Sequence, residues 1–232
     1  LAAVALFTFM GYILEKAGLM ERLFRALLLI SGRLKGSLYL GTIFSATLFA
    51  AATGIVGASV TIIGLMAAPV MKKSGYSSGL SAGAITAGGT LGILIPPSIM
   101  LVVMGPVMQV SVARLFAAAI LPGLILASLY VAYTMIRVMI NPELGPALSD
   151  EELDVPTGFK VREFFLGLVP PMVLILATLG TIITGLATPT EGAALGCLGA
   201  VIVAKVNGKL TFGLLKEAVF RTAETTSMVM IL

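Results

Sequence analysis

Residues 88–98 read GGTLGILIPPS, and this stretch decides the fold because it interrupts an apolar, helix-like pattern over 79–108. Pro96 cannot donate to the helical hydrogen-bond ladder, and it disfavours helical geometry at Ile95. Carbonyls before Pro96 therefore lose their partners within the helix. Inside a membrane such carbonyls need a cation, water or a side chain. The pattern predicts a membrane helix that is broken at this point.

The composition places the surrounding chain in a bilayer. Of the 232 residues, 58% are hydrophobic and only 11% are charged, whereas about 25% are charged in ordinary soluble domains. Four long runs lack Asp, Glu, Lys and Arg altogether: 36–71, 74–113, 115–136 and 164–190. Each exceeds the roughly 18 apolar residues that suggest a spanning helix. The fold class predicted is an all-α polytopic membrane protein.

Several function classes are excluded or disfavoured by residue counts. The chain has no His and a single Cys, Cys197, which excludes transition-metal sites of the His/Cys type, His-based catalytic triads and an internal disulfide. The net charge of +4 is typical of membrane-protein loops that fix orientation, so we expect no nucleic-acid partner. The chain begins and ends inside apolar runs, and we expect it to be a fragment.

The uncharged run 36–71 predicts a hairpin. As one helix it would be about 54 Å long, well beyond a hydrocarbon core of about 30 Å. Its midpoint is small and polar, with Thr53, Gly54, Gly57 and Ser59. A re-entrant helical hairpin, entering and leaving on one side, fits this run better than two full spans.

The rest of the chain divides by charge and hydropathy. Residues 1–14 are typical of the end of a spanning helix, and 15–35 of an amphipathic segment along the interface. We expect the remaining segments as follows: a span over 114–137, a cytoplasmic loop over 138–163, and spans over about 164–186, 188–204 and 219–232. If 36–71 re-enters, every Lys and Arg except Arg114 lies on one face, which the positive-inside rule makes cytoplasmic.

Two clusters of small residues, 53–61 and 88–98, are the candidate site. A hairpin tip beside a broken helix is how secondary transporters build ion and substrate sites. The alternative is that Gly, Ala, Ser and Thr only permit close helix packing. Glu191 is a second candidate, since membrane carboxylates are often functional. We favour a capping box instead, in which Thr188 caps a helix and Glu191 stands three residues later.

The strings ATGIVGASVTIIGLMAAPVM (52–71), ITAGGTLGILIPPSIML (85–101) and GLATPTEGAALG (185–196) resemble the large membrane subunit of TRAP transporters, the tripartite ATP-independent periplasmic family. The resemblance covers essentially the whole chain. It implies an elevator-type ion-transporter fold, here as a partial chain. Residues 1–35 would end a transmembrane helix and form an arm, 36–137 a transport-type half, and 164–232 the start of a second repeat.

The resemblance also implies a sodium site, with no other cofactor. Its hairpin-tip residues would be Thr53, Gly54, Gly57 and Ser59. Its broken-helix residues would be Gly89, Thr90, Gly92, Pro96, Pro97 and Ser98. Many members have Ser-Gly-Ser-Ser where this chain has Thr53-Gly54-Ile55-Val56, so backbone carbonyls would contribute more at this tip. A full subunit has a second hairpin and broken helix beyond the region present here.

The implied function is sodium-coupled import of carboxylates across the bacterial inner membrane. The partners would be a small membrane subunit and a periplasmic substrate-binding protein. Two alternatives stay open: a stand-alone sodium-coupled dicarboxylate carrier, and a structural subunit that transports nothing. A membrane-embedded enzyme is disfavoured, because one Glu and one Cys do not supply converging catalytic groups.

Overall fold

The described chain is predominantly helical. A computed structural model describes residues 2–148 and 156–231, and that part contains no strand. Residues 149–155 of the loop predicted over 138–163 lie outside the described residues. The elements in chain order are α1 (Ala2–Lys16), α2 (Leu19–Ser31), α3 (Ser37–Thr53), α4 (Val56–Lys73), α5 (Ser78–Thr90), η1 (Leu91–Ile93), α6 (Ile99–Met108), α7 (Val112–Ile140), η2 (Pro142–Leu144), α9 (Thr157–Ile183), α10 (Pro189–Val206) and α11 (Phe212–Ile231).

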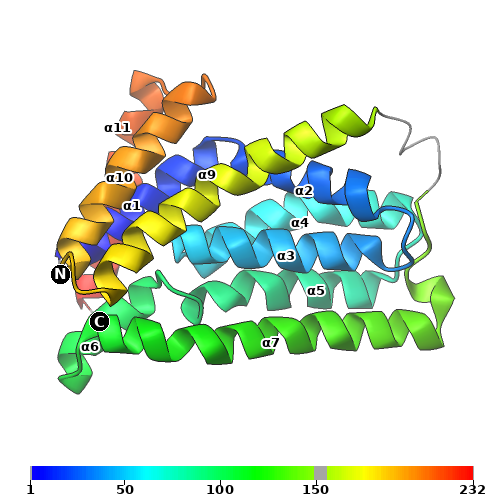
Figure 1. Cartoon of the computed structure of the whole chain (residues 1–232), viewed down its shortest axis with the longest axis horizontal. Coiled ribbons are helices and arrows are strands. Elements are labelled where there is room, and N and C mark those ends of the chain that lie inside the picture. Colours follow the sequence, from blue (N-terminus) through cyan, green and yellow to red (C-terminus); the bar gives the residue numbers. More distant parts are fainter. Residues whose placement is uncertain (1, 149–155, 232) are drawn as a thin grey trace.

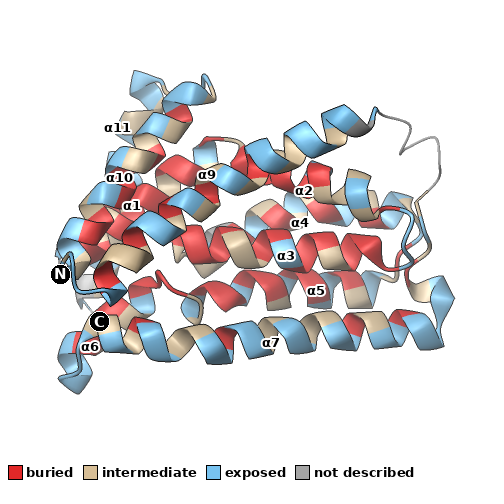
Figure 2. Cartoon of the chain, in the orientation of Figure 1, coloured by how far each residue is buried: buried red, intermediate tan, exposed pale blue. Residues whose placement is uncertain are grey.

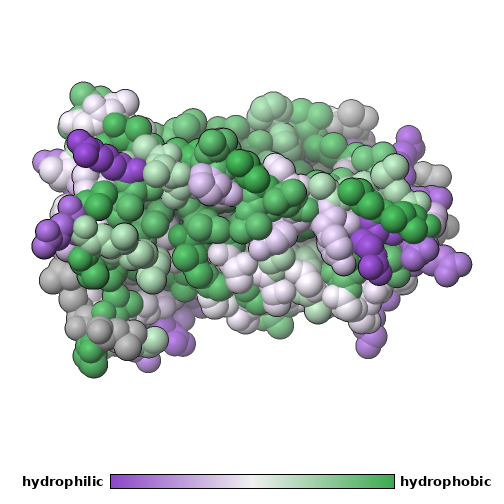
Figure 3. Space-filling view, turned by 90° about the horizontal axis from the view of Figure 1, so that it is seen from below, coloured by the Kyte–Doolittle hydropathy of each residue, from purple (hydrophilic) through white to green (hydrophobic). Residues whose placement is uncertain are grey.

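Three of these helices, α7, α9 and α10, are long and apolar enough to cross a membrane. Helices α1 and α2 together would make a fourth span, but they are bent by 56° at their junction. Most of the surface seen in Figure 3 is hydrophobic, and the hydrophilic residues gather mainly toward the two ends. The chain is therefore a multi-pass, all-α membrane protein.

The helices extend further than the apolar runs. Helix α9 begins at Thr157, inside the segment predicted as a loop, and α11 begins at Phe212 rather than near 219. Hydropathy marks the part of a helix that suits lipid, whereas charged residues such as Lys160 and Lys216 are good helix formers that continue it. The helix ends consequently lie beyond the hydropathy boundaries.

Two hydrophobic clusters organise the packing. The first, cluster 1, joins α1, α9 and α10 with two residues from α6 and single residues from α2, α3, α7 and α11. The second, cluster 2, joins α3, α4 and α5 with residues from α2 and α7. Figure 2 shows buried residues concentrated along α1 and α3, while α7 is exposed over much of its length. Helix α3 is thus the centre of one group and α1 the centre of the other.

Helices α3 and α4 form the hairpin, and α5 lies against both (Figure 1). The outer ends of this group are tied to the connection after α7. Gly36 N donates to Gly145 O (2.9 Å), Ser77 N donates to Leu144 O (3.1 Å), and the Tyr39 hydroxyl donates to the same Leu144 carbonyl (2.6 Å). These bonds place the start of α3, the start of α5 and the segment after α7 at one end of the molecule.

Close packing of α5 on α3 depends on glycine. A Cβ atom added at Gly88 would lie 2.7 Å from the Ala46 Cβ and 3.3 Å from the Ile43 Cα, both on α3. Side chains cannot fit at that separation, so the two helices approach through their backbones.

Substituting Gly88 should therefore separate α5 from α3. We expect Gly88→Ala to lower stability by about 1–3 kcal/mol through overpacking. Thermal unfolding of the full-length protein in detergent measures this. Gly83→Ala is the matched control, because Gly83 is on the same helix with nothing within 4 Å of its added Cβ. Equal melting temperatures for the two variants would contradict the packing account.

Candidate functional site

The hairpin turns within two residues. Helix α3 ends at Thr53, and Gly54 follows with φ of 66°, in the left-handed region. The Gly54 N–H donates to the Ala50 carbonyl at 2.7 Å, which closes the end of α3 in the way glycine commonly does. Ile55 is extended, and α4 starts at Val56. The tip therefore places the C-terminus of one helix directly beside the N-terminus of the next.

Two buried hydroxyls connect the sides of the tip. Thr53 Oγ1 donates to the Phe49 carbonyl (3.0 Å), and Ser59 Oγ donates to the Ile55 carbonyl (2.8 Å). The two hydroxyl oxygens lie 3.3 Å apart. Since each hydroxyl has a carbonyl within donating distance, lone pairs on both oxygens remain for another partner.

The interrupted helix has a short irregular stretch. Helix α5 ends at Thr90, a 3-10 turn covers Leu91–Ile93, and α6 begins at Ile99. The Pro96–Pro97 peptide bond is cis. The Ser98 hydroxyl, which is buried, donates to the Ile93 carbonyl at 2.8 Å. One carbonyl before the prolines is thus satisfied by a side chain from the far side of the break.

The hairpin tip (residues 53–59) and the break in the interrupted helix (residues 91–98) approach each other through backbone atoms. A Cβ at Gly54 would lie 3.2 Å from Ile99 N and 3.4 Å from Pro97 O. Further along, a Cβ at Gly92 would lie 2.8 Å from Ala50 O on α3, and one at Gly89 would lie 3.0 Å from Val60 N on α4. The structure therefore brings Gly54 and Pro97 together. It also packs Gly92 against α3 and Gly89 against α4, the two arms of the hairpin.

The remaining predicted residues divide between the interior and the surface. Pro96 and Ser98 are buried at the break. Thr90 is exposed, and its hydroxyl donates to the Ala87 carbonyl (2.9 Å). Gly57 is also exposed, with open space around its added Cβ. Thr90 and Gly57 therefore lie outside the buried Thr53–Ser59 contact.

Sequence reasoning missed a third element at the tip. A Cβ added at Gly11, on α1, would lie 2.7 Å from the Thr53 carbonyl oxygen and 3.1 Å from the Thr53 Cα. The α1 backbone thus touches the hairpin tip from the side of cluster 1. A glycine inside an apolar helix was the available signal, but its partner lies 42 positions away in the chain, and no local pattern indicates it.

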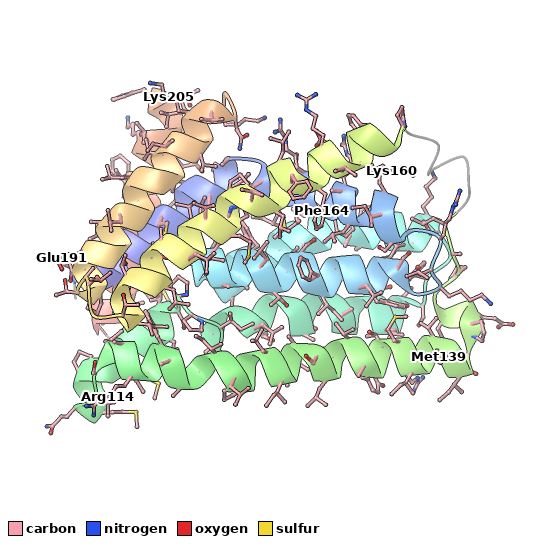
Figure 4. All side chains as sticks on the ribbon, viewed as in Figure 1. Arg114, Met139, Lys160, Phe164, Glu191 and Lys205 are labelled. Carbon is pink, nitrogen blue, oxygen red and sulfur yellow. The ribbon has the colours of Figure 1, made fainter. Side chains whose placement is uncertain are left out.

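Thr188 and Glu191 form the capping box at the start of α10. The Glu191 N–H donates to Thr188 Oγ1 (3.3 Å), and the Thr188 N–H donates to Glu191 Oε2 (2.8 Å). Both residues are exposed, and Figure 4 shows Glu191 at the left end of the molecule. Their hydrogen bonds stabilise a helix end, which is the structural role favoured for them.

The electrostatics at the tip and break come from helix ends. No residue in 53–59 or 88–98 is charged. The described residues contain no group of three or more His, Cys, Asp or Glu that could hold a metal ion. Helices α3 and α5 present C-terminal ends here, and α4 and α6 present N-terminal ends. Partial negative and partial positive charges therefore lie side by side.

Comparison with known proteins identifies relatives across this whole arrangement. Residues 1–232 match the family described as "Tripartite ATP-independent periplasmic transporter, DctM component". The C4-dicarboxylate TRAP transporter large permease protein of Pseudomonas aeruginosa is 34% identical over 88% of this chain and 46% of that protein. The sialic acid TRAP transporter large permease protein of Vibrio cholerae is 31% identical over 99% of this chain and 51% of that protein.

A third relative has a different named substrate. The ectoine/5-hydroxyectoine TRAP transporter large permease protein of Ruegeria pomeroyi is 31% identical over 99% of this chain and 51% of that protein. The chain thus spans about half the length of these three curated relatives.

The contact between tip and break can be tested at Gly54. We expect Gly54→Ala to cost about 1 kcal/mol from left-handed strain and about 1–2 kcal/mol more from crowding against Ile99 and Pro97. Gly185→Ala is the control, because Gly185 has φ of 75° but nothing within 4 Å of its added Cβ. Thermal unfolding of both full-length variants isolates the contact. If the control loses as much stability as Gly54→Ala, the contact contributes nothing.

Proposed function

Because the chain belongs to the DctM family of tripartite ATP-independent periplasmic transporters, we propose that it forms part of the membrane permease of a sodium-coupled importer of organic acids. This family consists of transport proteins, so the chain is not an enzyme. The observation that carries the proposal is the backbone contact of Gly54 with Pro97 and Ile99. It joins two interrupted helices at one point, as ion and substrate sites of secondary transporters require.

Sodium is the coupling ion that the available ligands favour. The tip offers the paired hydroxyls of Thr53 and Ser59, 3.3 Å apart, beside the C-terminal end of α3. Hard cations prefer oxygen ligands, and the partial negative charge of a helix C-terminus adds to their attraction. A singly charged cation needs no carboxylate in such a place. The uncharged surroundings of the tip therefore support sodium over a divalent metal.

The substrate group is a carboxylate. Helices α4 and α6 begin at the same contact, and helix N-termini attract anions through free N–H groups and the helix dipole. The exposed Thr90 and Gly57 leave one side of this region open. The organic acid itself stays open, since relatives of similar identity are named for C4-dicarboxylate, sialic acid and ectoine.

Transport would proceed by an elevator movement. Cluster 2 holds most of the hairpin and α5, whereas cluster 1 holds α1, α9 and α10 together with Ala52 at the hairpin tip. Sodium would order the tip against the break and fix the helix ends around the carboxylate. The hairpin group would then move past α1, carrying both, with α2 as the arm between the two groups. The hairpin is proposed as re-entrant because its two outer ends lie at one end of the molecule.

The proposed partners are a small membrane subunit and a periplasmic substrate-binding protein that delivers the acid, and the location is the bacterial inner membrane. Uptake into proteoliposomes tests this assembly, using the full-length subunit with and without a sodium gradient, the small subunit and the cognate binding protein. We expect uptake to need all three. Uptake without the binding protein would instead indicate a stand-alone carrier, and no uptake in any combination would indicate a structural subunit.

Thr90 lies outside the buried Thr53–Ser59 contact, on the open side of the break, and we propose that its hydroxyl adds a sodium ligand from that side. Thr90→Val tests this, because it removes the hydroxyl and keeps the side-chain shape. We expect the sodium concentration for half-maximal uptake to rise about tenfold, the effect of one lost interaction with a charged group. Thr86→Val is the matched control: Thr86 is one turn earlier on α5, exposed, and its hydroxyl also donates within the helix. Unchanged sodium activation in Thr90→Val would exclude Thr90 from the site.

A further inference from the structure

A polar cleft lies away from the tip, where the α1–α2 turn meets the start of α9 and the segment between α10 and α11. Its volume is about 310 Å³. Charged residues line it from three directions: Glu21, Arg22 and Arg25 from α2, Glu163 from α9, and Lys209 after α10. The proposed transport mechanism uses none of these side chains.

Part of the cleft wall is fixed by hydrogen bonds. Arg22 Nη1 donates to Asn207 Oδ1 (3.5 Å), and Asn207 Nδ2 donates to the Ala17 carbonyl (3.3 Å). These contacts tie the end of α1 and the start of α2 to the segment after α10. The wall is therefore built by the fold, with Arg22 held half-buried in it.

The other charged groups are not paired with one another. Within the described ranges, 2–148 and 156–231, Arg25, Lys209, Glu21 and Glu163 make no ion pair within 4.0 Å. Opposite charges around one cleft that do not close on each other leave room for a ligand between them. A ligand that pairs with both kinds of charge would carry both an anionic and a cationic group.

Apolar side chains are exposed on the helices beside the cleft. Phe159 lines the cleft, and other apolar residues are exposed on the adjoining helices, with Phe165 and Val169 on α9 and Ile202 and Val206 on α10. Figure 4 shows Lys160 and Lys205, at the ends of these two helices, along the same upper side of the molecule. A polar cleft beside exposed apolar helices at their charged ends is typical of a membrane interface.

We propose that this cleft binds the headgroup of a phospholipid that carries a primary ammonium group beside its phosphate. Arg25 and Lys209, with Arg22, would hold the phosphate, because guanidinium and ammonium groups donate strongly to phosphate oxygens. Glu21 and Glu163 would accept from the ammonium group. The acyl chains would follow the exposed apolar faces of α9 and α10. The lipid would thereby brace α2, the arm of the proposed transport movement, against α9.

Native mass spectrometry of the full-length protein tests the proposal. The protein is purified in detergent with equal amounts of phosphatidylethanolamine, phosphatidylcholine and phosphatidylglycerol. We expect selective retention of phosphatidylethanolamine, since phosphatidylcholine has no ammonium N–H and phosphatidylglycerol has no cation. Equal retention of the three lipids would overturn the proposal. So would equally tight binding of soluble glycerophosphoethanolamine, which would assign the cleft to a free phosphoester.

Two sets of variants locate the lipid. Arg25→Gln with Lys209→Gln should reduce bound phosphatidylethanolamine about tenfold, as expected for the loss of a charge-assisted hydrogen bond. Arg162→Gln with Lys205→Gln is the control, because it removes the same charge from exposed residues of α9 and α10 outside the cleft lining. Equal loss in both pairs, or in neither, would contradict the assignment.

A third variant reports on the ammonium group alone. Glu163→Gln should reduce the preference for phosphatidylethanolamine over phosphatidylglycerol while leaving total lipid retention similar. Glu163→Gln leaves Arg25 and Lys209 unchanged, so it remains informative if the Arg25→Gln, Lys209→Gln double variant does not fold. An unchanged preference would remove Glu163 from the site and leave the ammonium group without its proposed partner on α9.

Discussion

Backbone N–H and C=O groups surrounded by apolar material must find partners within the protein, and most of this structure follows from how two interrupted helices meet that requirement. The Ser98 hydroxyl reaches back to the Ile93 carbonyl, and the Gly54 N–H closes the end of α3 on Ala50. The two interruptions then lie against each other, with Gly54 beside Pro97 and Ile99. Helix packing nearby supports this contact, because the glycines of α5 let that helix pack closely against both α3 and α4.

The consequence is that the proposed site contains no charged side chain. Four helix ends and two buried hydroxyls supply its polarity. Desolvating a fixed charge inside a membrane protein is costly, whereas helix dipoles and hydroxyls exist without that cost. We propose that a site built in this way binds a cation and an anion together and releases them again. This property suits a transporter, which has to release what it binds.

The sequence predicts the places where helices stop better than it predicts what those places contact. Glycine and proline act locally, so the strings around Gly54 and Pro96 indicate the interruptions that the structure contains. The helix ends near Thr157 and Phe212 were not predicted, because hydropathy follows lipid exposure and not helical geometry. Thr90 and Gly57 belong to the same strings as the buried residues, but the rotation of each helix turns them outward. The contact of Gly11 with Thr53 depends on the packing of distant segments, which no single string encodes.

We propose that sodium binds where the hairpin tip meets the broken helix. Hydrogen–deuterium exchange of the full-length protein, compared in sodium and in potassium at equal ionic strength, tests it most directly. If sodium binds there, amide exchange should be slower in peptides covering 53–59 and 91–99 when sodium is present, with no change in peptides from α10. Equal exchange of the tip and break peptides in the two salts, or protection confined to α10, would contradict it.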